Sequence, residues 1–179
     1  MYKRQGVFRN GVFYLRNSNT GGNADLTFAY GAPGDSPISG DWTGIGIDTV
    51  GVFRNGVFYL RNSNTGGNAD LTFAYGAPGD RPVSGDCTGI GIDTVGVFRN
   101  GVFYLRNSNT GGVADNTFTF GQAGDIPVVG DWNLDGKTEV GIFRNGMVAL
   151  AGSNTDGGGT VTYFTYGQAN DIPVAGYWI

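Results

Sequence analysis

Hydrophobic and polar residues alternate along this chain in short runs, and clusters of glycine, asparagine and aspartate separate the runs. Two such runs, Thr49–Arg54 and Val57–Asn62, flank the dipeptide Asn55-Gly56. Asn-Gly between alternating runs is typical of a two-residue β-hairpin, because both central residues of that turn need a positive φ. No segment repeats apolar residues at helical spacing. The pattern therefore predicts an all-β protein.

The turn also predicts which residues of this hairpin face each other. It places Phe53 opposite Phe58 and Val52 opposite Tyr59. One face of the hairpin then carries the two phenylalanines and Leu60, while the other face carries Val52 and Tyr59. Since both faces are apolar, both must be covered. A sheet stacked between two similar sheets meets that requirement.

Two further strands are expected in the same unit. Leu71–Tyr75 alternates apolar and polar residues after a loop rich in asparagine, threonine and glycine. Pro82 begins a shorter apolar run, and proline is tolerated at the first residue of a strand because no ladder donor is needed there. Four short antiparallel strands joined by tight turns are typical of one blade of a β-propeller.

The hairpin sequence recurs along the chain. GVFRNGVFYLRNSNTGG begins at Gly6, Gly51 and Gly96, so the period is 45 residues, and a looser copy begins at Gly141. A period of about 40–50 residues that holds several strands indicates a propeller or a related β-array. We therefore predict a single β-propeller domain over residues 6–179. Its units are residues 6–50, 51–95, 96–140 and 141–179.

The frame of the blades suggests how the ring closes. If a blade begins at the proline-containing strand, the chain starts with the last three strands of a blade, within residues 6–30. The missing first strand is then Ile172–Trp178, and its return to the start gives four blades without open sheet edges. Two alternatives stay open: a homo-oligomer in which copies close a larger ring, and a blade-swapped dimer.

The first five residues do not fit the repeat. MYKRQ shares nothing with the IDTV that precedes the second and third copies. We expect residues 1–5 to be a non-native leader on part of a longer array, with a genuine short tail as the alternative.

Charge and apolar run length bear on the partners. The net charge is −4, and beyond residue 5 the lysines and arginines are scattered singly, so we expect no nucleic-acid partner. No apolar run approaches the length of a membrane span, so we expect the chain to have no membrane-spanning segment.

Few residues suit catalysis. The chain has no histidine, and its one cysteine, Cys87, stands where the other copies have tryptophan. Cys87 therefore has no imidazole to activate it, and we interpret it as a drifted tryptophan position. A paired-carboxylate glycosidase built on Asp35, Asp41 and their copies is an alternative, but acids that recur with the repeat favour a structural role. We predict that the protein is not an enzyme.

One loop has the composition of a metal site. Residues 131–139 read DWNLDGKTE, with oxygen-bearing side chains at positions 1, 3, 5 and 9 and a glycine at position 6. Ca²⁺ takes about six to eight oxygen ligands, and the glycine permits the bend that turns the next carbonyl inward. The alternative is a turn in which the carboxylates only accept backbone hydrogen bonds. The predicted Ca²⁺ ligands are Asp131, Asn133, Asp135, Lys137 through its carbonyl, and Glu139.

The corresponding loops of the first two units have lost part of this set. The loops that begin at Asp41 and Asp86 have Ile45 and Ile90 where a carboxylate belongs at position 5. Isoleucine cannot bind a hard cation, so we expect these two loops to bind Ca²⁺ weakly or not at all.

These motifs resemble those of a known family. The loop, which follows GDIPVVG and precedes VGIFRNG, resembles the calcium loop of FG-GAP (VCBS-type) repeats. Such repeats form the blades of integrin α-subunit heads and of many bacterial surface proteins. FAYGAPGD and FTFGQAGD resemble the Phe-Gly and Gly-Ala-Pro pattern of the family, although the blade is shorter and the pair is interrupted in FAYG. The resemblance implies Ca²⁺ between the first two strands of a blade and an extracellular or cell-surface location.

The expected function is a non-catalytic extracellular repeat scaffold for binding or adhesion, with a protein or glycan ligand. The alternative is a lectin-like propeller with one sugar pocket per blade. Trp42, Trp132 and Trp178 recur beside the loops, where they either line a sugar-binding rim or pack between blades. Arg54 and Arg61 are expected on strand rims or over aromatic faces, with an anionic ligand as a further alternative.

Overall fold

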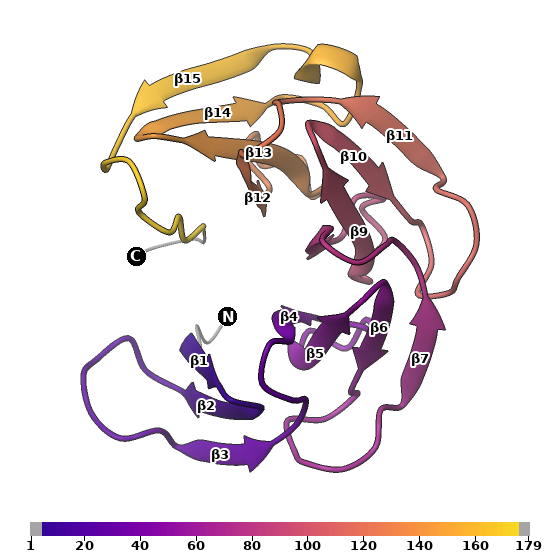
Figure 1. Ribbon diagram of the computed structural model, residues 1–179, viewed down its shortest axis with the longest axis vertical. Coiled ribbons are helices and arrows are strands. Elements are labelled where there is room, and N and C mark those ends of the chain that lie inside the picture. The colour runs from indigo at the N-terminus through magenta and orange to yellow at the C-terminus, as the bar shows by residue number, and fades with distance from the viewer. Residues whose placement is uncertain (1–4, 176–179) are drawn as a thin grey trace.

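The computed structural model describes residues 5–175 and shows an all-β arrangement of four sheets around a central axis (Figure 1). Every sheet is antiparallel, and one short 3-10 helix is the only helix among the described residues. No helix in this part of the chain is long and apolar enough to cross a membrane. The predicted four-blade propeller arrangement is therefore confirmed.

In chain order, the strands of each sheet run outward from the axis (Figure 1). Sheet A consists of β1 (Gln5–Arg9), β2 (Val12–Arg16) and β3 (Leu26–Ala29). Sheet B consists of β4 (Ser36–Gly40), β5 (Thr49–Arg54), β6 (Val57–Leu60) and β7 (Leu71–Ala74). Sheet C consists of β8 (Arg81–Gly85), β9 (Thr94–Arg99), β10 (Val102–Leu105) and β11 (Asn116–Thr119). Sheet D consists of β12 (Ile126–Gly130), β13 (Glu139–Arg144), β14 (Met147–Ala151) and β15 (Val161–Thr165), with the 3-10 helix η1 (Asp156–Gly158) before β15.

The hairpin prediction holds in register and in turn geometry. β5 and β6 pair Phe53 with Phe58 and Val52 with Tyr59. Asn55 has φ 50° and the following glycine has φ 85°, as a two-residue turn with two positive φ values requires. The same left-handed asparagine recurs in the hairpins of the other three sheets. The repeated Asn-Gly therefore fixes the register of every blade.

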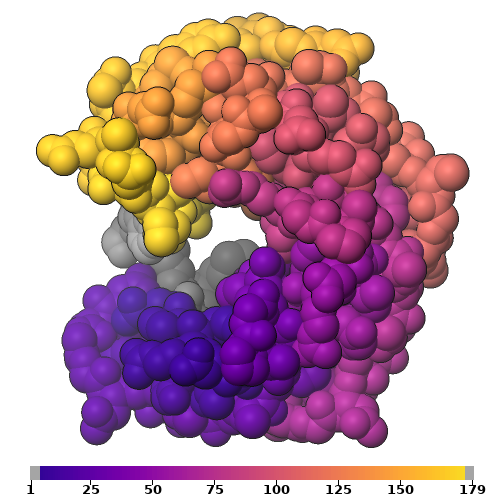
Figure 2. Space-filling view, in the orientation of Figure 1, coloured from indigo at the N-terminus to yellow at the C-terminus, as the bar shows by residue number. Residues whose placement is uncertain are grey.

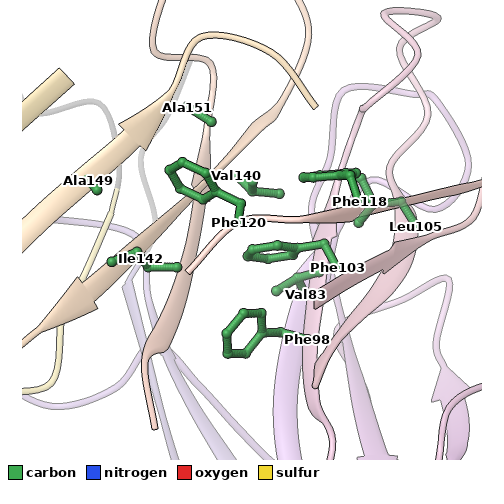
Figure 3. Close-up of a cluster of buried hydrophobic side chains, with 10 residues drawn as sticks. All are labelled: Val83, Phe98, Phe103, Leu105, Phe118, Phe120, Val140, Ile142, Ala149 and Ala151. Atoms are coloured by element: carbon green, nitrogen blue, oxygen red, sulfur yellow. The ribbon is translucent and has the colours of Figure 1, made fainter. Parts of the chain in front are cut away.

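Where two sheets are neighbours, their facing apolar surfaces pack against each other, as predicted. Phe58 and Leu60 of sheet B are fully buried and lie in one cluster with Val95 and Val97 of sheet C. Figure 3 shows the next such cluster, in which the phenylalanines of sheet C meet the small and branched side chains of sheet D. Each interface thus joins an aromatic face to an aliphatic face, and each sheet supplies both kinds.

One of the repeated tryptophans packs inside such an interface, and a second lies half-buried within its own sheet. Trp42 is buried in the cluster of sheets B and C, and a Cβ added to Gly40 would lie 2.7 Å from its ring. Trp132 covers Gly130 in the same way. Cys87 leaves a hollow of about 230 Å³ between sheets C and D. The packing alternative is therefore confirmed for Trp42, while Trp178 lies outside the described residues.

The chain ends differ from the expectation in two respects. Gln5, assigned to the leader, is the first residue of β1 and pairs with Arg16. Of the expected closing strand, residues 172–175 form no strand, and residues 176–179 lie outside the described part. Sheet A therefore has three strands in the described chain, and the edge of β1 is not paired within it. Residues 1–4 also lie outside the described part.

Candidate functional site

The loop of residues 131–139 connects β12 to β13. Gly130 at the end of β12 pairs with Glu139 at the start of β13. This pairing brings the two ends of the loop together, because adjacent residues on paired strands lie about 5 Å apart. Asp131 and Glu139 are positions 1 and 9 of the loop but become neighbours at its base.

Three carboxylates meet in this loop. One carboxylate oxygen from each of Asp131, Asp135 and Glu139 lies within 4.8 Å of the other two. The two aspartates are exposed, whereas Glu139 is only 3 % exposed. Three of the five predicted ligands are therefore gathered at one point, open to solvent on one side.

The backbone bends sharply to bring Asp135 back over Asp131. Leu134 has φ 61° and Gly136 has φ 87°, both in the left-handed region. The amide of Asp135 donates to Oδ1 of Asp131 (3.1 Å), and the amide of Gly136 donates to Oδ2 (3.0 Å). A Cβ at Gly136 would meet nothing within 4 Å, so the backbone conformation, not space, favours glycine there.

The other two predicted ligands contact Asp135. Asn133 accepts the amide of Asp135 through Oδ1 (2.9 Å) and donates from Nδ2 to its carboxylate (3.1 Å). The amide of Lys137 donates to Oδ1 of Asp135 (2.9 Å). These contacts hold Asp135 in place, and the roles of Asn133 and Lys137 as ligands stay predictions.

The electrostatics of the loop are unbalanced. Burial raises the pKa of Glu139, and the charges of Asp135 and Asp131 raise it further, while a hydrogen bond from the Trp132 amide (3.3 Å) acts in the opposite direction. A buried carboxylate beside two others of the same sign is costly unless a cation or a proton accompanies it. The loop therefore has the charge and the oxygen donors that suit a hard cation.

In the loops that begin at Asp41 and Asp86, backbone amides of the loop bind the carboxylate of one aspartate. The carboxylate of Asp41 accepts the amides of Gly44 (2.8 Å), Ile45 (3.1 Å) and Gly46 (2.5 Å). Burial alone would raise the pKa of Asp41, but these amide donors outweigh it and the pKa is lowered. Asp86 has the same amide partners in its own loop and a lowered pKa. A single aspartate is thus the centre of each of these loops.

Successive loops also contact one another. The amide of Asp41 donates to Oδ2 of Asp93 (2.8 Å), and the amide of Asp93 donates to the carbonyl of Asp41 (2.9 Å). One loop further on, the amide of Thr138 donates to the carbonyl of Asp86 (2.8 Å). The loop of residues 131–139 is therefore hydrogen-bonded directly to the loop that begins at Asp86.

Three ion pairs, each between a buried aspartate and a partly exposed arginine, were not predicted from the sequence. Asp35, whose side chain is 2 % exposed, binds Arg54 through two short contacts of 2.6 and 2.7 Å. The guanidinium also lies 5.3 Å from the ring centroid of Tyr59, which agrees with the expected aromatic contact. The available signal was the constant spacing of 19 residues, which recurs in the pairs Asp80–Arg99 and Asp125–Arg144.

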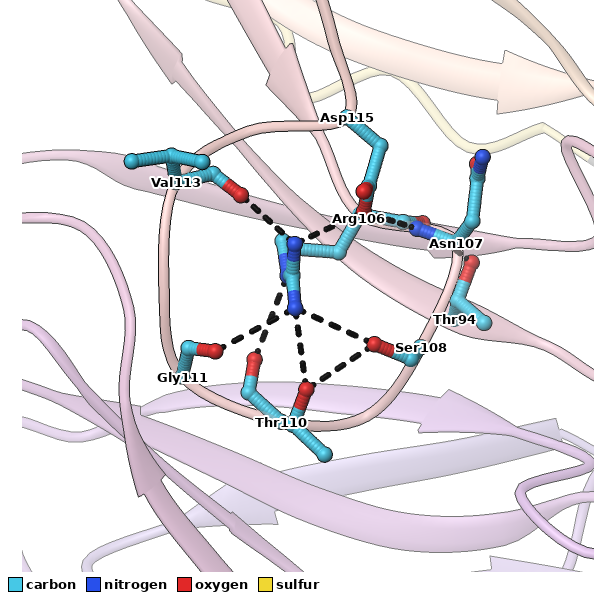
Figure 4. A network of polar contacts seen from close by, with 8 residues as sticks. All are labelled: Thr94, Arg106, Asn107, Ser108, Thr110, Gly111, Val113 and Asp115. Carbon is cyan, nitrogen blue, oxygen red and sulfur yellow. Dashed lines mark hydrogen bonds and ion pairs between the residues drawn. The ribbon is translucent and has the colours of Figure 1, made fainter.

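A second arginine of each repeat holds the outer loop. Figure 4 shows Arg106, which donates to the carbonyls of Thr110 (3.3 Å), Gly111 (3.2 Å) and Val113 (2.6 Å). It also pairs with the carboxylate of Asp115 (2.8 Å). Arg61 makes the equivalent contacts in its own loop. These arginines are occupied within the protein, which leaves little support for an anionic ligand at this position.

A hollow lies beside the first strands of sheets B and C. It has a volume of about 650 Å³, and its lining includes Arg54, Arg81, Asn55, Asp35 and Asp80. Asp35 and Asp80 are each bound to an arginine. The lining is therefore polar, with arginine and asparagine groups beside two carboxylates that are already paired.

Compared with protein-family models, with curated proteins and with solved structures, the chain has no match. The fold alone therefore defines the class of this protein, which is a β-propeller arrangement built from 45-residue repeats.

Proposed function

We propose that this protein is a non-catalytic, extracellular repeat scaffold for binding or adhesion, with FG-GAP-type blades and one Ca²⁺-stabilised loop at residues 131–139. The observation that carries the proposal is the convergence of the Asp131, Asp135 and Glu139 carboxylates at the base of that loop.

The donor set fits Ca²⁺. Asp131, Asp135 and Glu139 supply hard carboxylate oxygens, and Asn133 and the Lys137 carbonyl would complete the set. Cys87 lines the same hollow, but burial first and neighbouring carboxylates second raise its pKa to about 12. A neutral thiol is a poor metal ligand, so the soft metals that thiolates select are disfavoured.

A bound Ca²⁺ would supply positive charge where three carboxylates converge. The contribution of the chain is to position them: the β12–β13 pairing brings Asp131 next to Glu139, and the left-handed Leu134 and Gly136 return Asp135 to the same point. Because the loop joins two strands of sheet D and contacts the preceding loop, the ion would rigidify one rim of the ring.

Several contacts support a non-catalytic role. The acids considered for glycosidase chemistry are engaged within the fold, Asp35 by Arg54 and Asp41 by the amides of its own loop. The Cys87 thiol is neutral at physiological pH. A general acid or base must exchange a proton with a substrate, and carboxylates held in this way are poorly suited to do so.

The binding role rests on repetition. Each blade presents the same turns and loops, so a partner with repeated groups would gain from several weak contacts at once. The polar hollow beside Arg54 and Arg81 is a concave surface that could take part in such contacts. Trp42 is buried, which removes one of the aromatic platforms on which the lectin-like alternative depends.

The metal proposal is tested by thermal unfolding with 1 equivalent to excess CaCl₂ and with EDTA. Ca²⁺ should raise the midpoint by several degrees, since about 2.7 kcal/mol of stabilisation is expected at a free ion concentration 100 times Kd. Asp135→Ala should abolish the difference. Asp41→Ala is the matched control, because it should lower the midpoint equally with and without Ca²⁺. An unchanged midpoint of the parent protein at millimolar Ca²⁺ contradicts the proposal.

The binding role is tested on arrays of glycans and of extracellular-matrix proteins, each read with Ca²⁺ and with EDTA. Saturable binding to a protein ligand supports the scaffold proposal. Binding to one sugar class with several equivalent sites supports the lectin-like alternative instead, and turnover of any glycan would overturn the non-catalytic assignment.

A further inference from the structure

The three closed interfaces between the sheets are built alike. In each, an aromatic ring that follows the outermost strand of one sheet covers a branched residue on the second strand of the next sheet. The rings Tyr30, Tyr75 and Phe120 are all 6 % exposed, and the branched residues Val52, Val97 and Ile142 are 1–2 % exposed.

The same positions at the two ends of the ring are open. Tyr166, which corresponds to Tyr75, is 79 % exposed, and Val7, which corresponds to Val52, is 56 % exposed. Phe164 of sheet D is 45 % exposed, whereas its counterpart Phe118 in sheet C is 3 % exposed. Sheet D thus presents the aromatic half of an interface, and sheet A presents the aliphatic half. Figures 1 and 2 show that these two sheets flank the opening of the ring.

The two ends of the ring also carry the two partners of the repeated ion pair, an arginine on sheet A and an aspartate after sheet D. Asp171 accepts the amide of Gln168 (2.9 Å), as Asp35 accepts the amide of Ala32 (2.7 Å). At the other end, the Arg9 guanidinium lies 5.5 Å from the ring of Tyr14, as the Arg54 guanidinium lies over Tyr59. Arg9 and Asp171 therefore have the local setting of the three paired arginines and aspartates, but no ion pair joins them in the described structure.

The edge of β1 completes the match. β5, β9 and β13 each pair on both sides, whereas β1 pairs only with β2 among the described residues. Ile172 and Val174 occupy the repeat positions of Ser36 and Ile38 in β4, and both are strongly exposed. Residues 171–175 therefore have the sequence of a first strand that fits beside β1.

We propose that sheet A of one molecule binds sheet D and residues 171–175 of a second copy of this chain. Arg9 of one molecule and Asp171 of the other would then form the ion pair that occurs three times within each chain. The contact is head-to-tail, because the two surfaces differ from each other. It repeats an interface that the protein already forms three times within one chain. The assignment rests on the fold and is independent of the metal proposal.

Charge reversal tests the contact between molecules. Wild-type protein should show concentration-dependent association in sedimentation experiments at micromolar concentrations. Arg9→Asp alone and Asp171→Arg alone each place like charges across the contact, and should weaken association by about tenfold or more. An equimolar mixture of the two variants should regain wild-type association, because each mixed contact again joins an arginine to an aspartate.

Two controls separate this proposal from closure of the ring by its own tail. Arg54→Asp breaks an ion pair within one chain. Mixing this variant with Asp35→Arg should therefore not restore the stability that either variant loses. The double variant R9D/D171R restores the pair in either case, but only association between molecules gives rescue on mixing the single variants. If all proteins are monomers at 100 µM, or if the double variant is restored while the mixture is not, the proposal is wrong.

Folding of each variant is checked by circular dichroism, and a second substitution covers the case of a variant that does not fold. Tyr166→Ser removes an exposed ring, so the monomer should keep its spectrum while association falls by about tenfold. Gln5→Val supplies the valine that β5 and β9 have at this position, and it should strengthen association. Unchanged association of both variants would overturn the proposal.

Discussion

The loop of residues 131–139 and the loop of residues 41–49 occupy the same place in sheets D and B but bring different numbers of carboxylates together. In residues 41–49, one carboxylate accepts several amides of its own loop. In residues 131–139, three carboxylates converge and the buried one has a raised pKa. The sequence difference is small, since Ile45 and Thr49 stand where the other loop has Asp135 and Glu139. In both loops the first aspartate accepts amides of its own loop, and residues 131–139 add two further carboxylates whose charge the proposed Ca²⁺ would balance.

The largest effect is expected from Asp41→Ala. The substitution leaves the amides of Gly44, Ile45 and Gly46 without their acceptor, at a cost of about 2–3 kcal/mol in the free energy of unfolding. Urea denaturation should give this loss with Ca²⁺ and with EDTA alike. A loss that appears only with Ca²⁺ would mean that the two loops work in the same way.

Transfer of the acids from one loop to the other should transfer the metal response. Ile45→Asp combined with Thr49→Glu gives the loop at Asp41 the carboxylates of residues 131–139 at positions 5 and 9. The double variant should be less stable than the parent in EDTA and should recover about 2 kcal/mol in excess Ca²⁺. Isothermal titration should then find one more site than in the parent. The single variant Ile45→Asp is the control, and an equal Ca²⁺ response from it would contradict the requirement for a position-9 carboxylate.

Glu139→Gln separates the destabilising effect of the buried charge without Ca²⁺ from its proposed role as a Ca²⁺ ligand. The folded-state pKa of Glu139 is raised, so between the unfolded value and this raised value the folded protein binds more protons than the unfolded chain. In EDTA, the stability of the parent should therefore fall as the pH rises through this interval, starting near pH 4.5. The glutamine variant should lack that fall and be more stable than the parent at pH 7 by on the order of 1 kcal/mol. With Ca²⁺ the order should reverse.

The opposite sign is expected for Asp41 in the same pH series. Its folded-state pKa is lowered from 3.8, so its contribution to stability is present above that value and is lost as the pH falls below it. Identical pH profiles for Glu139→Gln and Asp41→Ala would show that the two loops do not differ in the proposed way.

The smallest effect is expected from Cys87→Trp, which restores the residue found in the neighbouring blades. The ring would enter the hollow of about 230 Å³ beside residues 131–139 and should add about 1 kcal/mol to the stability. Cys87→Ser is the control for loss of the thiol alone. A loss of stability in the tryptophan variant would show that sheets C and D have closed around the smaller side chain.

The sequence predicts most of the fold because its signals are local and repeated. Asn55-Gly56 determines the hairpin register, and the alternation of Val52 and Phe53 predicts two buried faces. The same reasoning identified the acids of residues 131–139 as a group. It failed for the pair of Asp35 with Arg54, because a turn acid and a strand-end arginine meet only once the sheet has formed.

The sequence was also a weak guide to the ends of the chain. Residues 172–175 have the composition of a first strand, but a strand forms only where a partner edge lies within reach. Likewise, an aspartate that starts a glycine-rich loop is compatible both with metal binding and with amide acceptance. Asp41 and Asp131 differ in this respect only through the residues that the rest of the loop supplies.

The arginine at the centre of each outer loop has a consequence for variation. Arg61 and Arg106 hold their loops chiefly through main-chain carbonyls, including those of Asn68 and Val113, which occupy the same position in successive copies. Because every residue type offers a carbonyl, the side chain at that position can change from an amide to an exposed hydrocarbon while the path of the loop is kept. The outer circumference can therefore diversify one residue at a time, with each new side chain displayed on an unaltered frame.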